Sequence, residues 1–188
     1  MARPKSEEKR KHLLEAAAAA VAERGVGAST ALIAKMAGVA EGTLFRYFPS
    51  KEALLNETYL FLCEQMTQAL SQAFEASQPL PQRARAIWDR YIDWGLANRS
   101  WHRATAQLSV TEILTEETRA ADVAMFPDVG LAEALASSEI LAGNSPRFGD
   151  ALLVAIADVT IQFAAMEPNR AEAYKISGFK AFQRMFLD

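Results

Sequence analysis

The chain has 188 residues, of which 51% are hydrophobic and 23% charged, so it is long and apolar enough to bury a core and is not expected to be disordered. The net charge of -3 would by itself argue against a nucleic-acid-binding protein. However, residues 1–54 hold nine Lys and Arg against six Asp and Glu, whereas the remainder holds 11 against 17. A basic head on an acidic body is compatible with a polyanionic partner.

Cysteine usage and hydropathy predict the compartment. Cys63 is the only cysteine, so no internal disulfide can form, and a reducing cytoplasm is expected. The charged start MARPKSEEKRK is not followed by an uninterrupted apolar core, which argues against a signal peptide. No uncharged run exceeds ten residues, well short of the roughly 18 to 20 that span a bilayer. The sequence predicts a cytoplasmic protein with no membrane association.

Nearly every segment between Pro or Gly residues has helical rather than alternating periodicity, which predicts an all-α fold. The first helix is expected over 6–24, where its Ala run favours helix and one side of it is apolar. The residues predicted to be buried there are Leu13, Leu14, Ala17, Ala18 and Val21.

Residues 30–55 read as two short helices on a tight glycine turn, followed by a long helix. Thr30 is expected to cap the first helix, and Gly38 to end it in a left-handed conformation. Apolar positions at helical spacing predict the inner faces of the pair: Leu32, Ile33, Met36, Ala37, Val39, Leu44 and Phe48. The outward set is then Glu41, Gly42, Thr43, Phe45, Arg46 and Tyr47.

The long helix is expected to begin after a Ser50 cap and to run to about residue 74, before a boundary at Pro79 and Pro81. Further helices are expected over 81–98, 101–125, 129–141, 148–166 and 170–186. Two domains are predicted. Residues 1–54 form a three-helix DNA-binding domain, joined by the long helix to a helical ligand-sensing and dimerisation domain of residues 55–188.

Three motifs in register resemble the signature of the TetR family of bacterial transcriptional regulators. They are Leu13-Leu14-Glu15-Ala16-Ala17, Ile33-Ala34-Lys35-Met36-Ala37-Gly38-Val39, and the run from Gly42 to Leu54, GTLFRYFPSKEAL. The resemblance covers roughly residues 9 to 55. It implies a homodimeric helix-turn-helix repressor that binds a palindromic DNA operator and is released by a small hydrophobic or aromatic molecule.

The resemblance places the second short helix in the major groove. Thr30, Tyr47 and Lys51 match family positions that grip phosphates, and Thr43 offers a hydroxyl to phosphate and a methyl group to thymine. Gly42 lets the backbone approach the duplex. Glu41 and Arg46 are the candidates for base readout, since carboxylate accepts from cytosine N4 and guanidinium donates to guanine, although Arg46 could equally contact a phosphate.

Two residues depart from the family pattern. Ala40 stands where a capping Ser is common, and Phe45 stands where Tyr is common, so Phe45 is expected to pack against sugar or thymine methyl groups. The basic start, with Arg3, Lys5, Lys9, Arg10 and Lys11, reads equally as a solvated tail or as a DNA-binding arm. These departures leave the operator sequence open.

The resemblance implies a four-helix dimer bundle made by the last two helices. The predicted interface residues are Leu152, Ala155, Val159, Phe163, Ile176, Phe179, Phe182 and Phe186, for which an internal core is nearly as plausible a reading. The resemblance also implies an effector cavity in the middle of the chain, which is expected to be apolar with few polar anchors. Its candidates are Trp88, Tyr91, Trp94, Trp101, His102, Gln107, Met125, Phe126, Gln162 and Met166, each of which could instead be a core residue.

Two other functional classes, an enzyme and a DNA-binding protein without an effector, compete with this prediction. An enzyme is disfavoured because His12 and His102 are the only histidines, and no metal spacing, phosphate loop or nucleophile elbow occurs. No catalytic residue, metal or cofactor is predicted. The other rival is a helix-turn-helix protein without a small-molecule ligand, controlled by a protein partner or acting architecturally.

Overall fold

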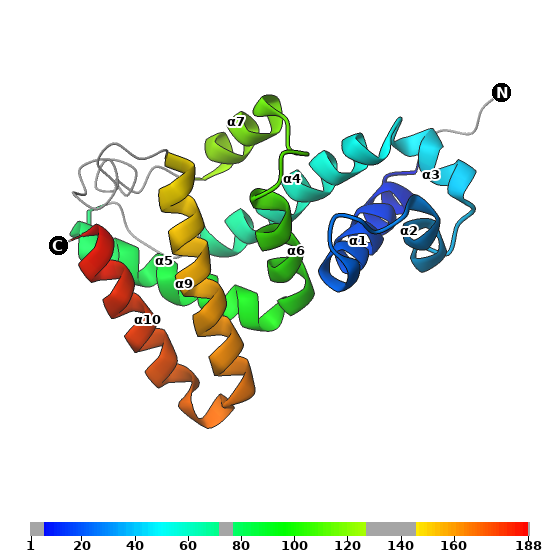
Figure 1. Ribbon diagram of the computed structural model, residues 1–188. Coiled ribbons are helices and arrows are strands. Elements are labelled where there is room, and N and C mark those ends of the chain that lie inside the picture. Colours follow the sequence, from blue (N-terminus) through cyan, green and yellow to red (C-terminus); the bar gives the residue numbers. More distant parts are fainter. Residues whose placement is uncertain (1–5, 72–76, 127–145, 188) are drawn as a thin grey trace. The chain divides into compact units, whose positions relative to one another are not determined.

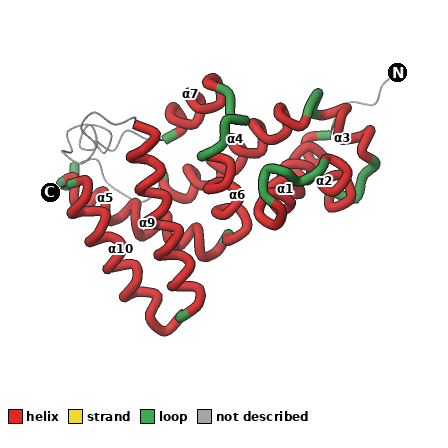
Figure 2. Tube along the Cα trace, viewed as in Figure 1, coloured by secondary structure: helices red, strands yellow, loops and turns green. Residues whose placement is uncertain are grey.

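The computed structural model describes residues 6–71, 77–126 and 146–187 (Figure 1). Figure 2 shows helices joined by short loops and no strand in these three ranges, which confirms the all-α prediction. Within them, no helix combines the length and the apolar character needed to cross a membrane.

The helices follow the predicted order closely. They are α1 (Glu7–Arg24), α2 (Thr30–Met36), α3 (Glu41–Tyr47), α4 (Lys51–Leu70), α5 (Leu80–Ala97), α6 (Arg99–Ser109), α7 (Glu116–Met125), α9 (Pro146–Met166), the 3-10 turn η1 (Pro168–Arg170) and α10 (Ala171–Phe186). The helix predicted over 129–141 lies outside the described residues.

The single helix predicted over 101–125 is wrong, because the chain breaks between α6 and α7. The Arg119 guanidinium donates to the carbonyl oxygens of Ser109 (3.1 Å) and Thr111 (2.6 Å), which stabilises the turn. Thr115 then accepts from the Thr118 amide at 3.1 Å, as an N-cap does. The break therefore has its own capping chemistry.

Contacts divide the chain into two compact units. The first contains residues 1–65 and 99–125, and the second contains residues 66–98 and 126–188. Helix α4 passes from one unit into the other without interruption. The functional division after residue 54 stays a prediction.

Two apolar clusters hold the first unit together. One lies among α1, α2 and α3 and includes Leu13, Ile33, Leu44, Phe48 and Leu54. The second joins α1 to α4 and α6 through Val21, Leu55, Leu62, Ala104 and Leu108, among others. All five residues of the first helix that were predicted to be buried are buried. Met36 is the exception in α2, since 41% of it is exposed rather than packed inside.

The turn between α2 and α3 has the geometry that its glycine predicts. Gly38 has a φ of 67°, and its amide donates to the Lys35 carbonyl at 3.1 Å. The next amide, that of Val39, donates to the Ala34 carbonyl at 2.9 Å. These two bonds form a Schellman motif, in which glycine adopts the left-handed backbone at little cost.

In the second unit, α9 and α10 pack side by side as an antiparallel pair, and α5 packs against both (Figure 1). The Trp88 ring of α5 stacks on Phe182 of α10, with ring centroids 5.9 Å apart, and its indole nitrogen donates to the Lys175 carbonyl at 3.0 Å. Gly178 makes the close approach possible, because an added Cβ would lie 2.7 Å from Trp88 and 2.3 Å from the Thr160 hydroxyl.

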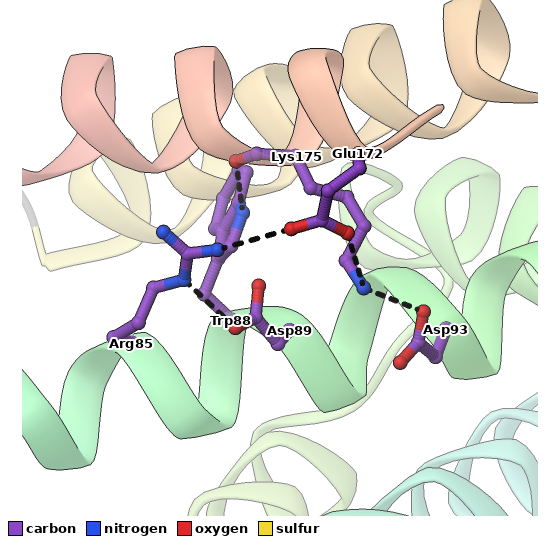
Figure 3. A network of polar contacts seen from close by, with 6 residues as sticks. All are labelled: Arg85, Trp88, Asp89, Asp93, Glu172 and Lys175. Atoms are coloured by element: carbon purple, nitrogen blue, oxygen red, sulfur yellow. Dashed lines mark hydrogen bonds and ion pairs between the residues drawn. The ribbon is translucent and has the colours of Figure 1, made fainter. Parts of the chain in front are cut away.

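A charged network covers the α5–α10 contact (Figure 3). Lys175 donates to Asp93 at 2.9 Å and lies 3.7 Å from Glu172. Arg85 bonds Asp89 at 2.7 Å and lies 3.6 Å from the same Glu172 carboxylate. Burial acts to lower the pKa of Lys175, but the hydrogen bond to Asp93 and the nearby carboxylates outweigh it, so this pKa is raised. Charges from both helices therefore fix their register.

Candidate nucleic-acid interface

Helix α3 presents a continuous exposed surface. Glu41, Gly42, Phe45 and Arg46 are exposed, whereas Thr43 and Tyr47 are half-buried at its margins. The opposite side is anchored by Leu44 and Phe48, both with 0% exposure. The buried anchors fix the rotation of the helix and thereby determine which side chains face outward.

The cap predicted for α2 is wrong by one residue. Ser29, not Thr30, is the N-cap, and its hydroxyl accepts from the Leu32 amide at 3.1 Å. Thr30 is the first residue of the helix, and its hydroxyl donates instead to the Glu41 carboxylate of α3 at 2.5 Å. Two residues predicted as separate DNA contacts are therefore joined to each other.

Helix α3 has no side-chain cap, as Ala40 predicted. Glu41 is the acidic residue of its first turn, where a negative charge offsets the helix dipole. At the other end of the helix, the Tyr47 hydroxyl accepts from the Ser6 amide at 3.1 Å. Ser50 caps α4 as predicted, accepting from the Ala53 amide at 3.1 Å, and this places Lys51 in the first turn of α4.

The basic start of the chain is used in part within the fold. Arg10 forms an ion pair with Glu57 of α4, and its guanidinium lies 5.7 Å from the centroid of the Phe48 ring. Lys9 and Lys11 are exposed, whereas Arg3 and Lys5 lie outside the described residues. The sequence analysis placed Arg10 among the tail or arm residues, and nothing in its spacing indicated this ion pair between α1 and α4.

Asn56 is a functional candidate that sequence reasoning missed. It is 8% exposed, and its amide group donates to the carbonyl oxygens of Glu52 (2.8 Å) and Ile113 (3.0 Å). Its carbonyl oxygen accepts from the Thr115 amide at 2.9 Å. The helix that follows α3 is thereby bound to the α6–α7 turn. The one sequence signal for this role is that Asn56 is a polar residue on the otherwise apolar face of its helix.

Cys63 lies in a polar cluster on the same helix. The Tyr59 hydroxyl donates to Asp122 of α7 at 2.8 Å, and burial, together with the Asp122 charge, raises the pKa of both Tyr59 and the fully buried Cys63. A buried, protonated thiol is not an activated nucleophile.

The predicted effector residues are distributed over both units. Trp101, His102, Gln107 and Met125 belong to the first unit, where Trp101 packs edge-on against Phe61. In the second unit, Trp88, Tyr91 and Trp94 are buried, and the last two are stacked with centroids 6.3 Å apart. Phe126 is half-buried, whereas Gln162 and Met166 are exposed.

The predicted dimer residues separate into two sets. Val159, Phe163 and Ile176 are 54%, 42% and 36% exposed, Ala155 is also exposed, and Leu152 is half-buried. Phe179, Phe182 and Phe186 are instead buried in a row of ring contacts that includes Trp88. Those three rings belong to the internal core. The exposed Ala155, Val159, Phe163 and Ile176 remain as the surface available to a partner.

Helix α1, the two short helices α2 and α3, and the Schellman turn between them define a helix-turn-helix module, the class of domain that reads DNA with the second helix of the motif. Residues 13–58 match the profile of bacterial regulatory proteins of the tetR family. This N-terminal part of the chain therefore carries the DNA-binding module of the TetR family.

Known proteins agree with that assignment. The chain is 37% identical over 83 residues to the uncharacterized HTH-type transcriptional regulator YhgD of Bacillus subtilis. This alignment covers 43% of this chain and 44% of YhgD. The match thus spans less than half of that curated relative. A crystal structure of a TetR-family transcription regulator from Shewanella sp. PV-4 superposes with a TM-score of 0.71 at 24% identity, covering 93% and 95% of the two chains. The structure of the transcriptional regulator FadR of Bacillus subtilis, solved in complex with stearoyl-CoA, superposes with a TM-score of 0.63 at 19% sequence identity. The match covers 90% of this chain and 95% of FadR.

Proposed function

We propose that this protein is a ligand-responsive transcriptional repressor, which binds a palindromic operator in double-stranded DNA as a homodimer. The observation that carries the proposal is the outward face of α3, whose exposed Glu41, Gly42, Phe45 and Arg46 stand above the buried Leu44 and Phe48. The Schellman turn fixes this helix against α2, so that it can enter a major groove as one rigid reading element.

The dimer is supported by the apolar residues that α9 and α10 leave exposed, above all Val159, Phe163 and Ile176. One short helix reads only a few base pairs, so useful selectivity requires two copies. A two-fold dimer places its recognition helices about one DNA turn, roughly 34 Å, apart on a palindrome.

The effector is proposed to be a small hydrophobic or aromatic molecule. The aromatic residues of α5 and the structural likeness to FadR, a regulator solved with a long-chain acyl ligand, support this class. Such a molecule would act only by binding one dimer geometry more tightly than the other.

One observation favours the second candidate, a DNA-binding protein without a small-molecule ligand. Trp88, the first predicted effector residue, is packed by Phe179 and Phe182 of its own chain and bonded to the Lys175 carbonyl. A protein partner or an architectural role would then replace the effector.

The test is salt-dependent binding of the purified protein to the DNA upstream of its own gene. We expect Arg46→Ala to weaken selective binding by about 1–3 kcal/mol if Arg46 reads a base, and Tyr47→Ala to weaken it through a lost phosphate contact. Arg103→Ala, at an exposed position of α6, is the matched control and should bind as wild type does. Weak binding that ignores sequence and all three substitutions would overturn the operator-binding proposal.

A panel of hydrophobic compounds then distinguishes the two candidates. Release of the operator by one compound, accompanied by direct binding of that compound, supports the ligand-controlled repressor. Selective DNA binding that no compound alters, together with a co-purifying protein that does alter it, supports the second candidate.

A further inference from the structure

The hydrogen bond between Thr30 and Glu41 joins the first turns of α2 and α3 across 11 positions of sequence. Its O···O distance of 2.5 Å is typical of a hydroxyl that donates to an ionised carboxylate. Thr30 is free for this bond because Ser29 provides the cap of α2. The bond therefore uses the only proton that the Thr30 hydroxyl can donate.

The Thr30–Glu41 hydrogen bond affects how this corner of the domain can bind DNA. Thr30 cannot donate to a phosphate while it donates to Glu41, and the exposed Glu41 carboxylate would repel any phosphate that approaches this corner of the domain. Binding through Thr30 thus requires that Glu41 find another donor. In the major groove, the cytosine N4 amino group is the donor that a carboxylate accepts.

Building on the proposed function, we propose that the Thr30–Glu41 pair is a specificity device that penalises non-operator DNA. On an operator with a cytosine within reach, Glu41 accepts from the base and Thr30 is released to a phosphate. On other sequences Glu41 finds no donor, so Thr30 stays bonded to it and the carboxylate charge opposes the backbone. Glu41 acts here by excluding wrong sites as well as by recognising the right one.

The structure provides a further reason for a charged residue at this position. Because Ala40 gives α3 no side-chain cap, Glu41 offers the compensating negative charge in the first turn. A neutral isostere, Gln, keeps the size and an acceptor oxygen for Thr30 but removes the charge. The substitution Glu41→Gln therefore separates electrostatic exclusion from the geometry of the hydrogen bond.

The experiment measures fluorescence anisotropy of two labelled duplexes of equal length, the selected operator and a scrambled version, at one fixed salt concentration. We expect Glu41→Gln to bind the scrambled duplex about fivefold more tightly than wild type and the operator no more tightly, so that the ratio of affinities falls at least about fivefold. Glu64→Gln, at an exposed position of α4, makes the same change in net charge and should leave the ratio unchanged.

Thr30→Val tests the coupling. In the wild-type background it should weaken operator binding several-fold and leave scrambled-duplex binding unchanged. With Glu41→Gln, which keeps the acceptor for Thr30, it should again leave scrambled-duplex binding unchanged. Equal effects of Glu41→Gln and Glu64→Gln, or a loss from Thr30→Val that is the same on both duplexes, would overturn the inference. If wild type binds both duplexes equally, the proposed function fails and this inference with it. Thermal unfolding of each variant confirms that the fold is kept.

Discussion

Gly178 is the residue at which one methyl group should matter most in the second unit. Because an added Cβ would lie 2.3 Å from the Thr160 hydroxyl and 2.7 Å from Trp88, Gly178→Ala must push α10 away from α9 and α5. We expect it to lower the free energy of unfolding by about 1–3 kcal/mol, measured by urea denaturation followed by tryptophan fluorescence.

Ser177→Ala is the control, since Ser177 is the exposed neighbour on the same helix. It also introduces alanine and should be neutral or slightly stabilising. Similar losses from both substitutions would show that the α10 backbone, not the contact at Gly178, is sensitive.

At the residue scale, the sequence predicted which side chains of α3 face outward but not the hydrogen bond that Glu41 makes with Thr30. Ser29 and Thr30 are both good caps, and only the observed start of the helix decides between them. The bond from Thr30 to Glu41 joins residues in different helices, so it depends on a crossing that no local pattern contains. Met36 fits the helical period but lies at the edge of the apolar face, where it is exposed.

At the scale of elements, Asn56 connects α4 to the α6–α7 turn. Replacing it with Ala leaves the Ile113 carbonyl and the Thr115 amide without their partner, and we expect a loss of about 2–3 kcal/mol in the free energy of unfolding. Hydrogen exchange should show a faster-exchanging Thr115 amide.

The matched control is Asn98→Ala, which removes a single local bond, to the Trp94 carbonyl at 3.0 Å. We expect this change to cost about 1 kcal/mol or less. Unchanged exchange at Thr115 in the Asn56 variant would contradict the proposed connection.

The network on α5 and α10 should be sensitive to alkali, because Lys175 has a raised pKa in the folded protein. A raised pKa means that its contribution is fully present below the unfolded value, about 10.4, and is lost as the pH rises through the folded value. We expect Lys175→Met to cost about 1 kcal/mol at pH 7 to 9, with the difference from wild type shrinking above about pH 10.4.

The measurement is urea denaturation of both proteins over a pH series. Arg170→Met in η1 removes an exposed ion pair with Glu167, the residue before that turn, and serves as the control, which should show little difference in stability at any pH. If the difference in free energy of unfolding between the wild-type and Lys175→Met proteins persists unchanged to pH 11.5, the assigned role of Lys175 is contradicted.

The helices themselves were largely predictable, because capping residues, Pro and Gly mark most of their ends. The break between α6 and α7 was missed, since the segment up to residue 125 keeps a helical period and its turn is held by partners outside that period. Asn56 provides one of them from α4. Thr115, followed by Glu116 and Glu117, was the one local signal of a helix start.

At the scale of the whole molecule, the dimer prediction rests on the apolar residues of α9 and α10 that stay exposed. Val159→Glu places a charge in that surface, and we expect it to produce a monomer in sedimentation experiments and to weaken operator binding at least tenfold, because one recognition helix is lost.

Val123→Glu makes the same change on α7, where Val123 is 73% exposed in the first unit. It should leave the oligomeric state unchanged. A dimer that survives Val159→Glu, or dissociates equally with Val123→Glu, would place the interface elsewhere.

Sequence could not separate interface from core in these last helices. Phe163 and Phe179 both fit an apolar stripe, yet Phe163 is 42% exposed while Phe179 packs against Trp88. The distinction depends on where α5 crosses the pair, which periodicity along one helix does not encode. For the same reason, the predicted effector residues could not be assigned to one unit or the other.

The first unit is discontinuous in sequence, and this has a consequence for synthesis on the ribosome. The DNA-reading helices emerge early, but the apolar face of α4 with Leu55 and Leu62 is covered by Ala104 and Leu108 only when α6 arrives. At about 5–20 residues per second, the segment from residue 66 to 109, the end of α6, takes about 2 to 9 s to make. During that interval the nascent chain carries an uncovered apolar surface, so chaperone capture and early aggregation should depend on translation speed within this middle segment.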